Sequence, residues 1–500
     1  MVLKTKLAFL LIIGFGFLIR VWKLDIPLLE FYPTRQVQTA EITQNLLKDN
    51  LNILYPRVDY FGPEKSYYLI EFPGYNSIVA IVHLILGGVN DANGRIVSVL
   101  SYLLATIFLY LFTKKIFDEE VGLLTAFFFT ISPLNVLVSR SFQPEEMMIA
   151  ASVGSLLYLQ QWATSNRNFF LIVSALFFAW AVLLKITALV FLFLPFFYII
   201  SIKRGGLFKK TILFFFAIGL LPSLLWYFHA YSVSSKLTLS SLPGFDIFLW
   251  FGPKLLLDPK YFSTMFGVEF NTVILPAGLF LFLIGLLSKI KSGQFIVYWW
   301  LASVVLYFAI FNKHSMTHEY YHMPFLPIAS IFMALGFSNI LTSLKGIILS
   351  KTLIAILLLI LITIMSLPET SSRAYKPIGR FSDVVNAGVA IQRIAGENDL
   401  IVGIMDRGPT AVYYANRVGW HFGLDREEQK KEFTFYTGEE QDLTSAEEDL
   451  ENYIKKGAKF LVLATSEEFK KNENFQKYVY NNFELIDRGD KYLIFSLVRK

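Results

Sequence analysis

The sequence predicts a polytopic α-helical membrane protein that ends in a soluble α/β domain. Three observations predict this fold class: hydrophobic residues make up 55% of the 500-residue chain, charged residues make up only 17%, and 37 of the 84 charged side chains fall within residues 381–500. A soluble domain carries about 25% charged residues. The composition therefore excludes an ordinary soluble enzyme, a disordered chain and a fibrous protein.

The chain contains no cysteine. This excludes a disulfide scaffold, a thiolate metal site and a cysteine nucleophile. The formal net charge is +6. In a membrane protein such a basic excess reports on the sidedness of the loops, so it does not predict a nucleic-acid partner.

Apolar runs of spanning length predict about eleven transmembrane helices within residues 1–370. The first run is expected to remain in the protein, because Arg20 and Lys23 follow it without a small-residue cleavage site. The expected spans are 7–22, 96–113, 121–138, 147–163, 168–184, 187–202, 211–228, 271–288, 295–311, 323–341 and 352–367.

Basic residues gather in short loops between the expected spans, as at Lys114/Lys115 and Lys289/Lys291. Basic loops stay in the cytoplasm, which places the N-terminus there too. The long loop at 23–95, with a re-entrant or interfacial helix at 75–89, then lies outside, as does the domain at 371–500. We therefore expect a multi-pass protein of the plasma (inner) membrane whose chemistry takes place on the outer face.

Residues 371–500 are expected to alternate helix and strand. This alternation predicts a small layered α/β domain. It has no glycine-rich phosphate loop and is not expected to bind a nucleotide. The expected helices are 382–395, 409–416, 446–456 and 467–482, the expected strands are 399–404 and 459–465, and a terminal hairpin is expected at 483–497.

Carboxylates, cations and aromatic residues converge in the loops predicted to be external. Carboxylates can act as general bases, and cations can hold a phosphate. The span centres, in contrast, are almost free of ionisable residues, which argues against a pump or secondary transporter. The candidate catalytic residues are Asp59, Glu71 and Glu145, and the candidate substrate-binding residues are Arg35, Gln36, Arg57, Arg140, Lys185, His318 and Tyr321.

Several short motifs occur in an order that resembles one enzyme class. Arg95 opens a span that ends in LYLFTKKIF, S-R-x-x-x-P-E follows at 139–145, and LLKITALVFLFLP follows at 183–195. HEYYHMPFLPIAS at 318–330 and AVYYANRVGW at 411–420 complete the series. The chain resembles the integral-membrane glycosyltransferases that use polyprenyl-phosphate sugars. Within them it is most similar to family 39, the dolichyl-phosphate-mannose protein mannosyltransferases and bacterial lipid A aminoarabinose transferases.

The resemblance covers nearly the whole chain and implies a multi-span fold of the glycosyltransferase C type. It implies an inverting transfer of a hexosyl or pentosyl unit from a polyprenyl-phosphate donor to a protein, lipid or glycan acceptor. An external carboxylate would deprotonate the acceptor hydroxyl, and cations would hold the leaving phosphate. The implied partners are this donor, the acceptor and the lipid bilayer. No cofactor is required, although some relatives bind a divalent ion.

The first external loop departs from the family pattern. Relatives usually carry an acidic pair shortly before a Tyr-Ala or Thr-Ala pair, whereas here Arg35 and Gln36 precede Thr39-Ala40. The base therefore cannot be carried over directly. We favour the first-loop acids Asp59 and Glu71, followed by Glu145. His318 and Tyr321 are expected near the lipid phosphate.

Structural and functional alternatives remain open. Arg35 and Gln36 could cap an interfacial helix, Arg140 and Glu145 could form a structural ion pair, and Lys185 could extend to the membrane surface. At the level of function, a lipid-linked-sugar flippase or transporter would need acids in the middle of the membrane. A lipid-linked glycan ligase or polymerase would share the outer surface but would take an oligosaccharide diphosphate donor.

Overall fold

The structure, a computed structural model, forms two compact units, which are described separately. Unit 1 comprises Met1–Leu24, Arg95–Tyr227 and Asp246–Tyr375, and unit 2 comprises Asp25–Gly94, Phe228–Phe245 and Lys376–Lys500. The predicted division of the chain into a transferase domain at 1–370 and an α/β domain at 371–500 stays a prediction. The structure describes residues 2–64, 66–165, 167–203, 210–234, 250–343, 351–378, 383–404, 409–424, 427, 445–464 and 467–500.

Unit 1 is built from long apolar helices. Large hydrophobic side chains remain exposed along several of them, for example Leu224 on α10 and Ile364 on α16, as expected for surfaces that face lipid. The α-helices that lie wholly or mostly in unit 1 are α1 (Val2–Val21), α4 (Asp91–Ile116), α5 (Glu119–Ile131), α6 (Pro133–Ser139), α7 (Glu145–Ser165), α8 (Asn168–Leu184), α9 (Ala188–Tyr198), α10 (Lys210–Ser234), α11 (Pro259–Val268), α12 (Leu275–Leu286), α13 (Ile296–Ile310), α14 (Asn312–Thr317), α15 (Leu326–Ser343) and α16 (Lys351–Ala374).

The expected count of about eleven spans is not confirmed. Among the described residues, five helices are long and apolar enough to cross a membrane, or up to seven if each of two bent pairs forms one span. One bend, of 67°, separates α5 from α6, so the straight helix expected at 121–138 is corrected to two helices. The break falls at Ser132, directly before Pro133, because the residue before a proline is disfavoured in helical geometry.

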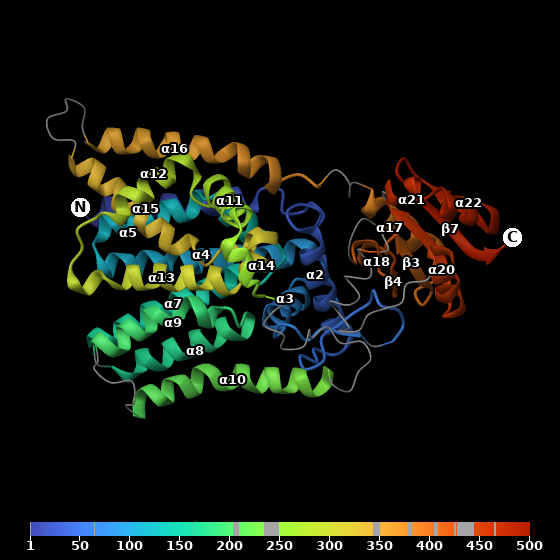
Figure 1. Cartoon of the computed structure of the whole chain (residues 1–500), viewed down its shortest axis with the longest axis horizontal. Helices are drawn as coiled ribbons and strands as arrows, with labels where there is room; N and C mark the ends of the chain where they lie inside the picture. The colour runs from blue at the N-terminus through green and yellow to red at the C-terminus, as the bar shows by residue number, and fades with distance from the viewer. Residues whose placement is uncertain are drawn as a thin grey trace. The chain divides into compact units, whose positions relative to one another are not determined.

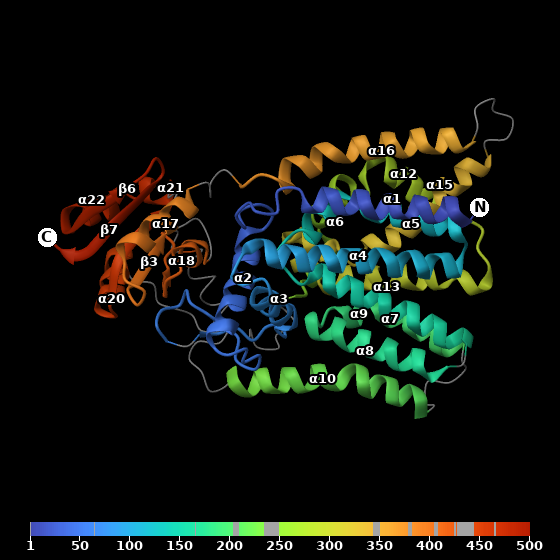
Figure 2. The ribbon, with the colours of Figure 1, turned by 180° about the vertical axis from the view of Figure 1, so that it is seen from behind.

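The helices of unit 1 lie side by side, and several of the neighbouring helices are far apart in the sequence (Figures 1 and 2). α1 packs on α5, α5 on α15, and α15 on α12, while α13 packs on α9 and α7 packs on α8. α12 and α15 approach each other closely at Gly285 and Gly336, where an added Cβ would collide with the backbone of the opposite helix. Small residues at such crossings are typical of helix packing in membranes.

Unit 2 contains a five-stranded sheet with the order β4-β3-β5-β7-β6. β4, β3 and β5 are parallel, whereas β7 runs antiparallel to both β5 and β6. Both predicted strands and the predicted hairpin are confirmed; β4 is an additional short strand. The strands are β3 (Leu400–Ile404), β4 (Gly419–His421), β5 (Ala458–Ala464), β6 (Phe483–Arg488) and β7 (Tyr492–Arg499).

Helices cover both faces of this sheet. Alternate strand residues point to opposite faces, so Ile401 joins the core beneath α17 and α18, and Val402 joins the core beneath α20 and α22. All the predicted helices of the domain are present, although the stretch at 467–482 divides in two. The helices are α17 (Val384–Ile394), α18 (Thr410–Ala415), α20 (Ala446–Lys455), α21 (Glu467–Lys471) and α22 (Glu473–Asn482).

The first loop belongs to the same unit. It folds into α2 (Pro33–Lys48), a hairpin of β1 (Arg57–Val58) and β2 (Ser66–Tyr67), and α3 (Gly74–Ile85). Val58, Tyr60 and Tyr68 share one hydrophobic core with α17 and the sheet. With 12 residues, α3 is too short to span a bilayer; its re-entrant or interfacial position stays a prediction.

Candidate functional site

In unit 1 a buried ion pair joins the first residue of α7 to the residue that ends α8. Nζ of Lys185 lies 2.6 Å from Oε1 of Glu145, and both side chains are buried. Each charge lies at the helix end that favours it, because a helix N-terminus attracts an anion and a C-terminus attracts a cation. Buried charges among membrane helices are costly and commonly mark function. The pair is therefore a candidate site.

Two tyrosine rings lie close to the same ammonium group. Nζ of Lys185 is 5.0 Å from the ring centroid of Tyr320 and 4.5 Å from that of Tyr321, within the range of cation–π attraction. The His318 ring centroid lies 5.3 Å from that of Tyr320 and 6.2 Å from that of Tyr321. The structure thus brings together four of the predicted residues, Glu145, Lys185, His318 and Tyr321.

His314 on α14 extends this group but adds no charge at neutral pH. Burial, together with the nearby Lys185 and Lys313, lowers the pKa of His314 to about 4. The group therefore holds two ammonium charges against the one carboxylate of Glu145. This excess of positive charge suits an anion such as a phosphate ester. We refer to Glu145, Lys185, Lys313, His314, His318, Tyr320 and Tyr321 as the Lys185 cluster.

Arg140 is buried in unit 1, and its donors face the backbone. Its guanidinium donates to the carbonyl oxygens of Trp22 at 3.0 Å, Lys23 at 2.9 Å, and Ala374. It also stacks over the Tyr375 ring at 4.5 Å from the centroid. These contacts hold the ends of α1 and α16 against α6. Its substrate-binding role stays a prediction.

Unit 1 contains a second buried arginine that the sequence did not single out. The Arg20 guanidinium lies 3.5 Å from the Tyr102 ring centroid and donates to Ser139 Oγ at 2.5 Å and to the Thr130 carbonyl at 3.1 Å. Because Arg20 follows the first apolar run, it resembles an ordinary boundary residue. The sequence does offer one signal. Lys23 follows Arg20 and can serve as the basic residue at the membrane surface, which leaves Arg20 available for a buried position.

The histidines of the 312–322 segment do not form a metal site in the described part of the chain, where no three metal-ligating side chains come together. His322, four residues after His318, instead faces Glu269: its Nδ1 lies 2.5 Å from Oε1 of Glu269, and its Nε2 lies 2.9 Å from the Ser315 carbonyl. Sequence reasoning missed Glu269, which lies in a short π-helix (Glu269–Val273) before α12.

In unit 2 the two ends of the first loop are joined by an ion pair. Nη2 of Arg35, in the first turn of α2, lies 2.5 Å from Oε2 of Glu71, shortly before α3. The neighbouring Gln36 is buried and donates to the Phe31 carbonyl at 2.8 Å. The structure thus pairs Arg35 with a candidate base and directs Gln36 to the backbone at the start of α2.

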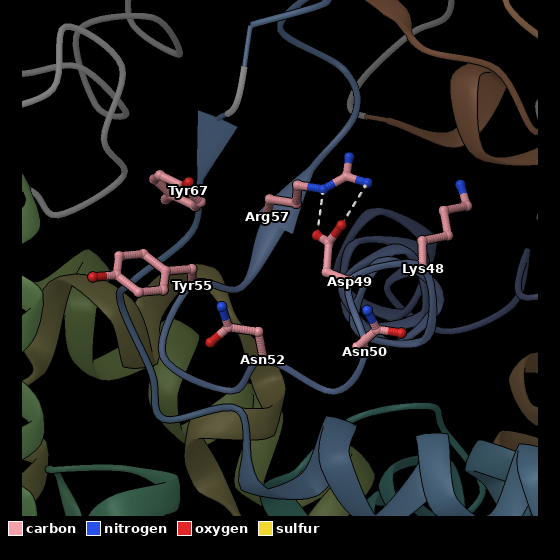
Figure 3. Close-up of a pocket in the computed structure, with 7 residues that line it drawn as sticks. All are labelled: Lys48, Asp49, Asn50, Asn52, Tyr55, Arg57 and Tyr67. Atoms are coloured by element: carbon pink, nitrogen blue, oxygen red, sulfur yellow. Dashed lines mark hydrogen bonds and ion pairs between the residues drawn. The ribbon is translucent and has the colours of Figure 1, made fainter.

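A second charged group lies at the C-terminal end of α2 in unit 2. The Arg57 guanidinium lies 2.6 Å from Oδ2 of Asp49 and 2.5 Å from Oδ1 of Asp59, and Nζ of Lys48 lies 3.5 Å from Oδ2 of Asp59. Figure 3 shows the pairing of Arg57 with Asp49. Asp49 was not a predicted site residue. Its ion pair with Arg57, the first residue of β1, identifies it as a member of this charged group.

The three candidate bases differ in their access to solvent. The side chain of Glu71 is 20% exposed, that of Asp59 is 7% exposed, and that of Glu145 is 1% exposed. A general base must reach the proton that it removes. All three are held by a cation, so only solvent access separates them, and by that criterion Glu71 is the most accessible of the three.

The sequence profile of the dolichyl-phosphate-mannose-protein mannosyltransferase family matches residues 72–227. This range contains both residues of the Lys185–Glu145 pair. In sequence, no curated protein matches the chain significantly.

The fold is similar to those of several solved enzymes. ArnT from Cupriavidus metallidurans bound to undecaprenyl phosphate superposes with a TM-score of 0.67 at 12% identity, over 98% of each chain. The oligosaccharyltransferase of Archaeoglobus fulgidus has a TM-score of 0.57 at 12% identity, over 91% of this chain and 69% of that one. The mycobacterial arabinofuranosyltransferase AftD has a TM-score of 0.54 at 12% identity, over 98% of this chain and 41% of that one.

At these identities the superpositions establish the fold alone, and the profile match shows a similarity that is limited to residues 72–227. The chain therefore has the fold of integral-membrane glycosyltransferases such as ArnT, and its residues 72–227 are similar to the dolichyl-phosphate-mannose-protein mannosyltransferases.

Proposed function

We propose that the protein transfers a sugar from a polyprenyl-phosphate carrier to an acceptor hydroxyl on the outer face of the membrane. The observation that carries this proposal is the buried Lys185–Glu145 pair beneath Tyr320 and Tyr321. The profile match over residues 72–227 and the fold shared with an enzyme solved with undecaprenyl phosphate support it.

The Lys185 cluster is assigned to the donor phosphate. An ammonium group has three donors, and we assign Lys185 to bind the phosphate oxygens as well as Glu145. Lys313 supplies the second positive charge, while His314, neutral at pH 7 because burial lowers its pKa to about 4, can donate or accept a hydrogen bond. Positive charge placed here would stabilise the phosphate as it leaves.

Glu71 is assigned as the general base. In the transfer, the acceptor hydroxyl oxygen forms a bond to the anomeric carbon while its proton passes to the Glu71 carboxylate. The bond from the anomeric carbon to the phosphate oxygen breaks, and its electron pair leaves with polyprenyl phosphate. Attack opposite the leaving group inverts the anomeric configuration. Arg35, 2.5 Å from Glu71, fixes the orientation of the base.

The orientation of the protein belongs to the same proposal. Residues 25–94 and 376–500 form one compact unit, so both segments lie on the same side of a membrane. Basic loops such as Lys114/Lys115 are assigned to the cytoplasm of a plasma-membrane protein, which leaves this unit outside. Residues 1–370 would then act as the transferase domain and 371–500 as an external α/β domain. No cofactor is required in this scheme.

The experiment that tests the proposal measures release of polyprenyl phosphate by purified protein in lipid nanodiscs, with polyprenyl-phosphate hexoses and pentoses as donors and cell-envelope extract as acceptor. The variants are Lys185→Gln and Glu71→Gln. The matched controls are Lys477→Gln and Glu473→Gln, whose side chains are 75% and 79% exposed on α22.

We expect release by wild type and by both controls, and loss of release in both site variants. Absence of release from wild type with every donor would overturn the proposal. Release from an oligosaccharide-diphosphate donor alone would instead establish the ligase activity. Release that is lost when EDTA removes divalent ions, and that returns when they are added back, would add a divalent ion to the scheme.

A further inference from the structure

A polar pocket of about 460 Å³ lies in unit 2, where α2 ends and the β1–β2 hairpin begins (Figure 3). Its volume lies within the range of small-molecule sites. Neither the proposed base nor the Lys185 cluster is among its lining residues. The pocket is lined by Lys48, Asp49, Asn50, Asn52, Tyr55, Arg57 and Tyr67.

The charges around this pocket compensate one another. Arg57 lies between the carboxylates of Asp49 and Asp59, with N–O distances of 2.6 Å and 2.5 Å. Lys48 lies 3.5 Å from the second oxygen of Asp59. Two cations thus face two anions, and little net charge remains to attract a phosphate or a carboxylate. The pocket is suited to a neutral ligand.

The remaining lining residues provide hydrogen bonds and aromatic surface. Asn50 and Asn52 each carry one acceptor oxygen and two donor hydrogens, the combination that a hydroxyl group needs. Tyr55 and Tyr67 lie together, with ring centroids 5.3 Å apart and planes tilted by 55°, and Figure 3 shows them on the side of the pocket opposite Asp49. A sugar ring has apolar C–H faces that pack on aromatic rings and hydroxyl edges that bond to amides.

The backbone holds this arrangement without a ligand. Arg57 and Tyr67 are directly opposite each other in the β1–β2 ladder. Asn50 adopts a left-handed conformation with φ of 54°, which asparagine tolerates at helix ends. The Leu51 amide then donates to the Leu46 carbonyl at 2.7 Å. The backbone that carries the amides and the rings is therefore fixed before a ligand arrives, which lowers part of the entropy cost of binding.

We propose that this pocket binds a neutral sugar unit of the acceptor, so that the acceptor is a glycan or glycolipid headgroup rather than a peptide. This inference rests on the proposed transferase function and names its acceptor class. Tyr55 and Tyr67 would contact the face of the sugar ring, and Asn50 and Asn52 would bind its hydroxyl groups. Asp49 and Arg57, held by each other, would bind further hydroxyls at the pocket edge.

The test is saturation-transfer NMR on the full chain in nanodiscs with a panel of neutral probes: the methyl glycosides of mannose, glucose, galactose and arabinose, and chitobiose. Inorganic phosphate and a serine- and threonine-rich peptide serve as competitors. Asn52→Ala and Tyr67→Leu are the pocket variants. Asn386→Ala, at an exposed position on α17 in the same unit, is the matched control.

We expect at least one glycoside to give saturation transfer with wild type and with Asn386→Ala. Its affinity should fall about tenfold or more in each pocket variant, because each variant removes a stacking or a hydrogen-bonding partner. Neither competitor should displace it. Absence of glycoside binding, unchanged binding in both pocket variants, or displacement by the peptide or by phosphate would overturn the inference.

Polyprenyl phosphate release by the same wild-type preparation separates this inference from the proposed function. Glycoside binding that depends on Asn52 and Tyr67, without donor cleavage, would retain the sugar pocket and reject the transferase assignment. Donor cleavage without glycoside binding would retain the transferase and reject the glycan acceptor.

Discussion

Arg35 and Glu71 lie 36 positions apart in the sequence and form an ion pair with an N–O distance of 2.5 Å. The pair links the first turn of α2 to the segment that leads into α3. The ion pair brings a carboxylate from the far end of the loop to the start of α2, where the sequence carries Arg35 and Gln36.

If Glu71 is the base, exchanging Arg35 and Glu71 will distinguish the effect of the pair on the reaction rate from its effect on stability. Glu71→Gln should lower the rate of polyprenyl phosphate release by about 10²–10⁴-fold, the usual contribution of a general base. The double variant Arg35→Glu/Glu71→Arg restores an ion pair and should recover the thermal stability lost in Arg35→Gln, which we expect to be about 1 kcal/mol or less. It should not recover release, because the carboxylate has moved. Recovery of both by the exchange would show that the pair is only structural.

The Lys185–Glu145 pair predicts a different pattern. Lys185→Gln alone leaves a buried carboxylate without its cation and should destabilise the fold by about 3–5 kcal/mol. Lys185→Gln/Glu145→Gln removes both charges, so most of that stability should return. Release should remain abolished in the double variant, because the Lys185 ammonium that is assigned to the donor phosphate is gone and only Lys313 is left. Thermal unfolding and donor titration on the same samples check this, and a double variant with wild-type KM for the donor would contradict the assignment.

The secondary structure of the soluble domain could be predicted because its signals are local. DLIVGI and KFLVLAT are apolar runs of strand length, and they form β3 and β5. β4, Gly419–His421, was missed because three residues carry no periodicity of their own; β3 supplies their hydrogen-bond partners. The bend at Pro133 was missed because hydropathy averages across it.

The candidate site could be predicted only in part, for the same physical reason. The sequence identifies charged residues in apolar surroundings, such as Lys185, but not their partners. Lys185 meets Glu145 and Tyr321 only through packing of α7, α8 and the 319–322 turn. Glu269 was missed because its partner, His322, lies 53 positions away in the sequence. Asp49 was missed because it pairs with Arg57 only through the turn that connects α2 to β1.

The titration of His314 is a test of the electrostatics around Lys185. Burial, Lys185 and Lys313 lower the pKa of His314 to about 4, below its ordinary value of 6.5. The folded protein therefore binds this proton at a lower pH than the unfolded chain does. The neutral ring's contribution to the free energy of unfolding is lost as the pH falls from about 6.5 towards 4. NMR of isotope-labelled histidine, assigned with His314→Gln, should show a neutral ring at pH 5.5. A midpoint above pH 6 would contradict this environment.

Glu41 on α2 predicts a stability change of the opposite sign with pH. Burial, and then the neighbouring Asp59 carboxylate, raise the pKa of Glu41 well above its usual value, although a hydrogen bond from the Asp59 backbone and the cations Lys48 and Arg57 offset part of this rise. The folded state holds this proton more tightly than the unfolded chain. The stability that Glu41 contributes is therefore present at acid pH, below its ordinary pKa, and is lost as the pH rises through the raised value.

Glu41→Gln replaces the carboxyl with a neutral group of the same shape and should remove this loss. At pH 8 we expect the variant to unfold at a higher temperature than wild type. Its free energy of unfolding should be larger by on the order of 1–3 kcal/mol, the usual cost of an uncompensated buried polar group. The difference should shrink towards zero near pH 4, where wild type is protonated as well. Glu64→Gln, at an exposed position in the same loop, is the control and should change neither curve. A Glu41→Gln variant that is less stable than wild type at pH 8 would show that the ionised carboxylate is stabilised by its surroundings.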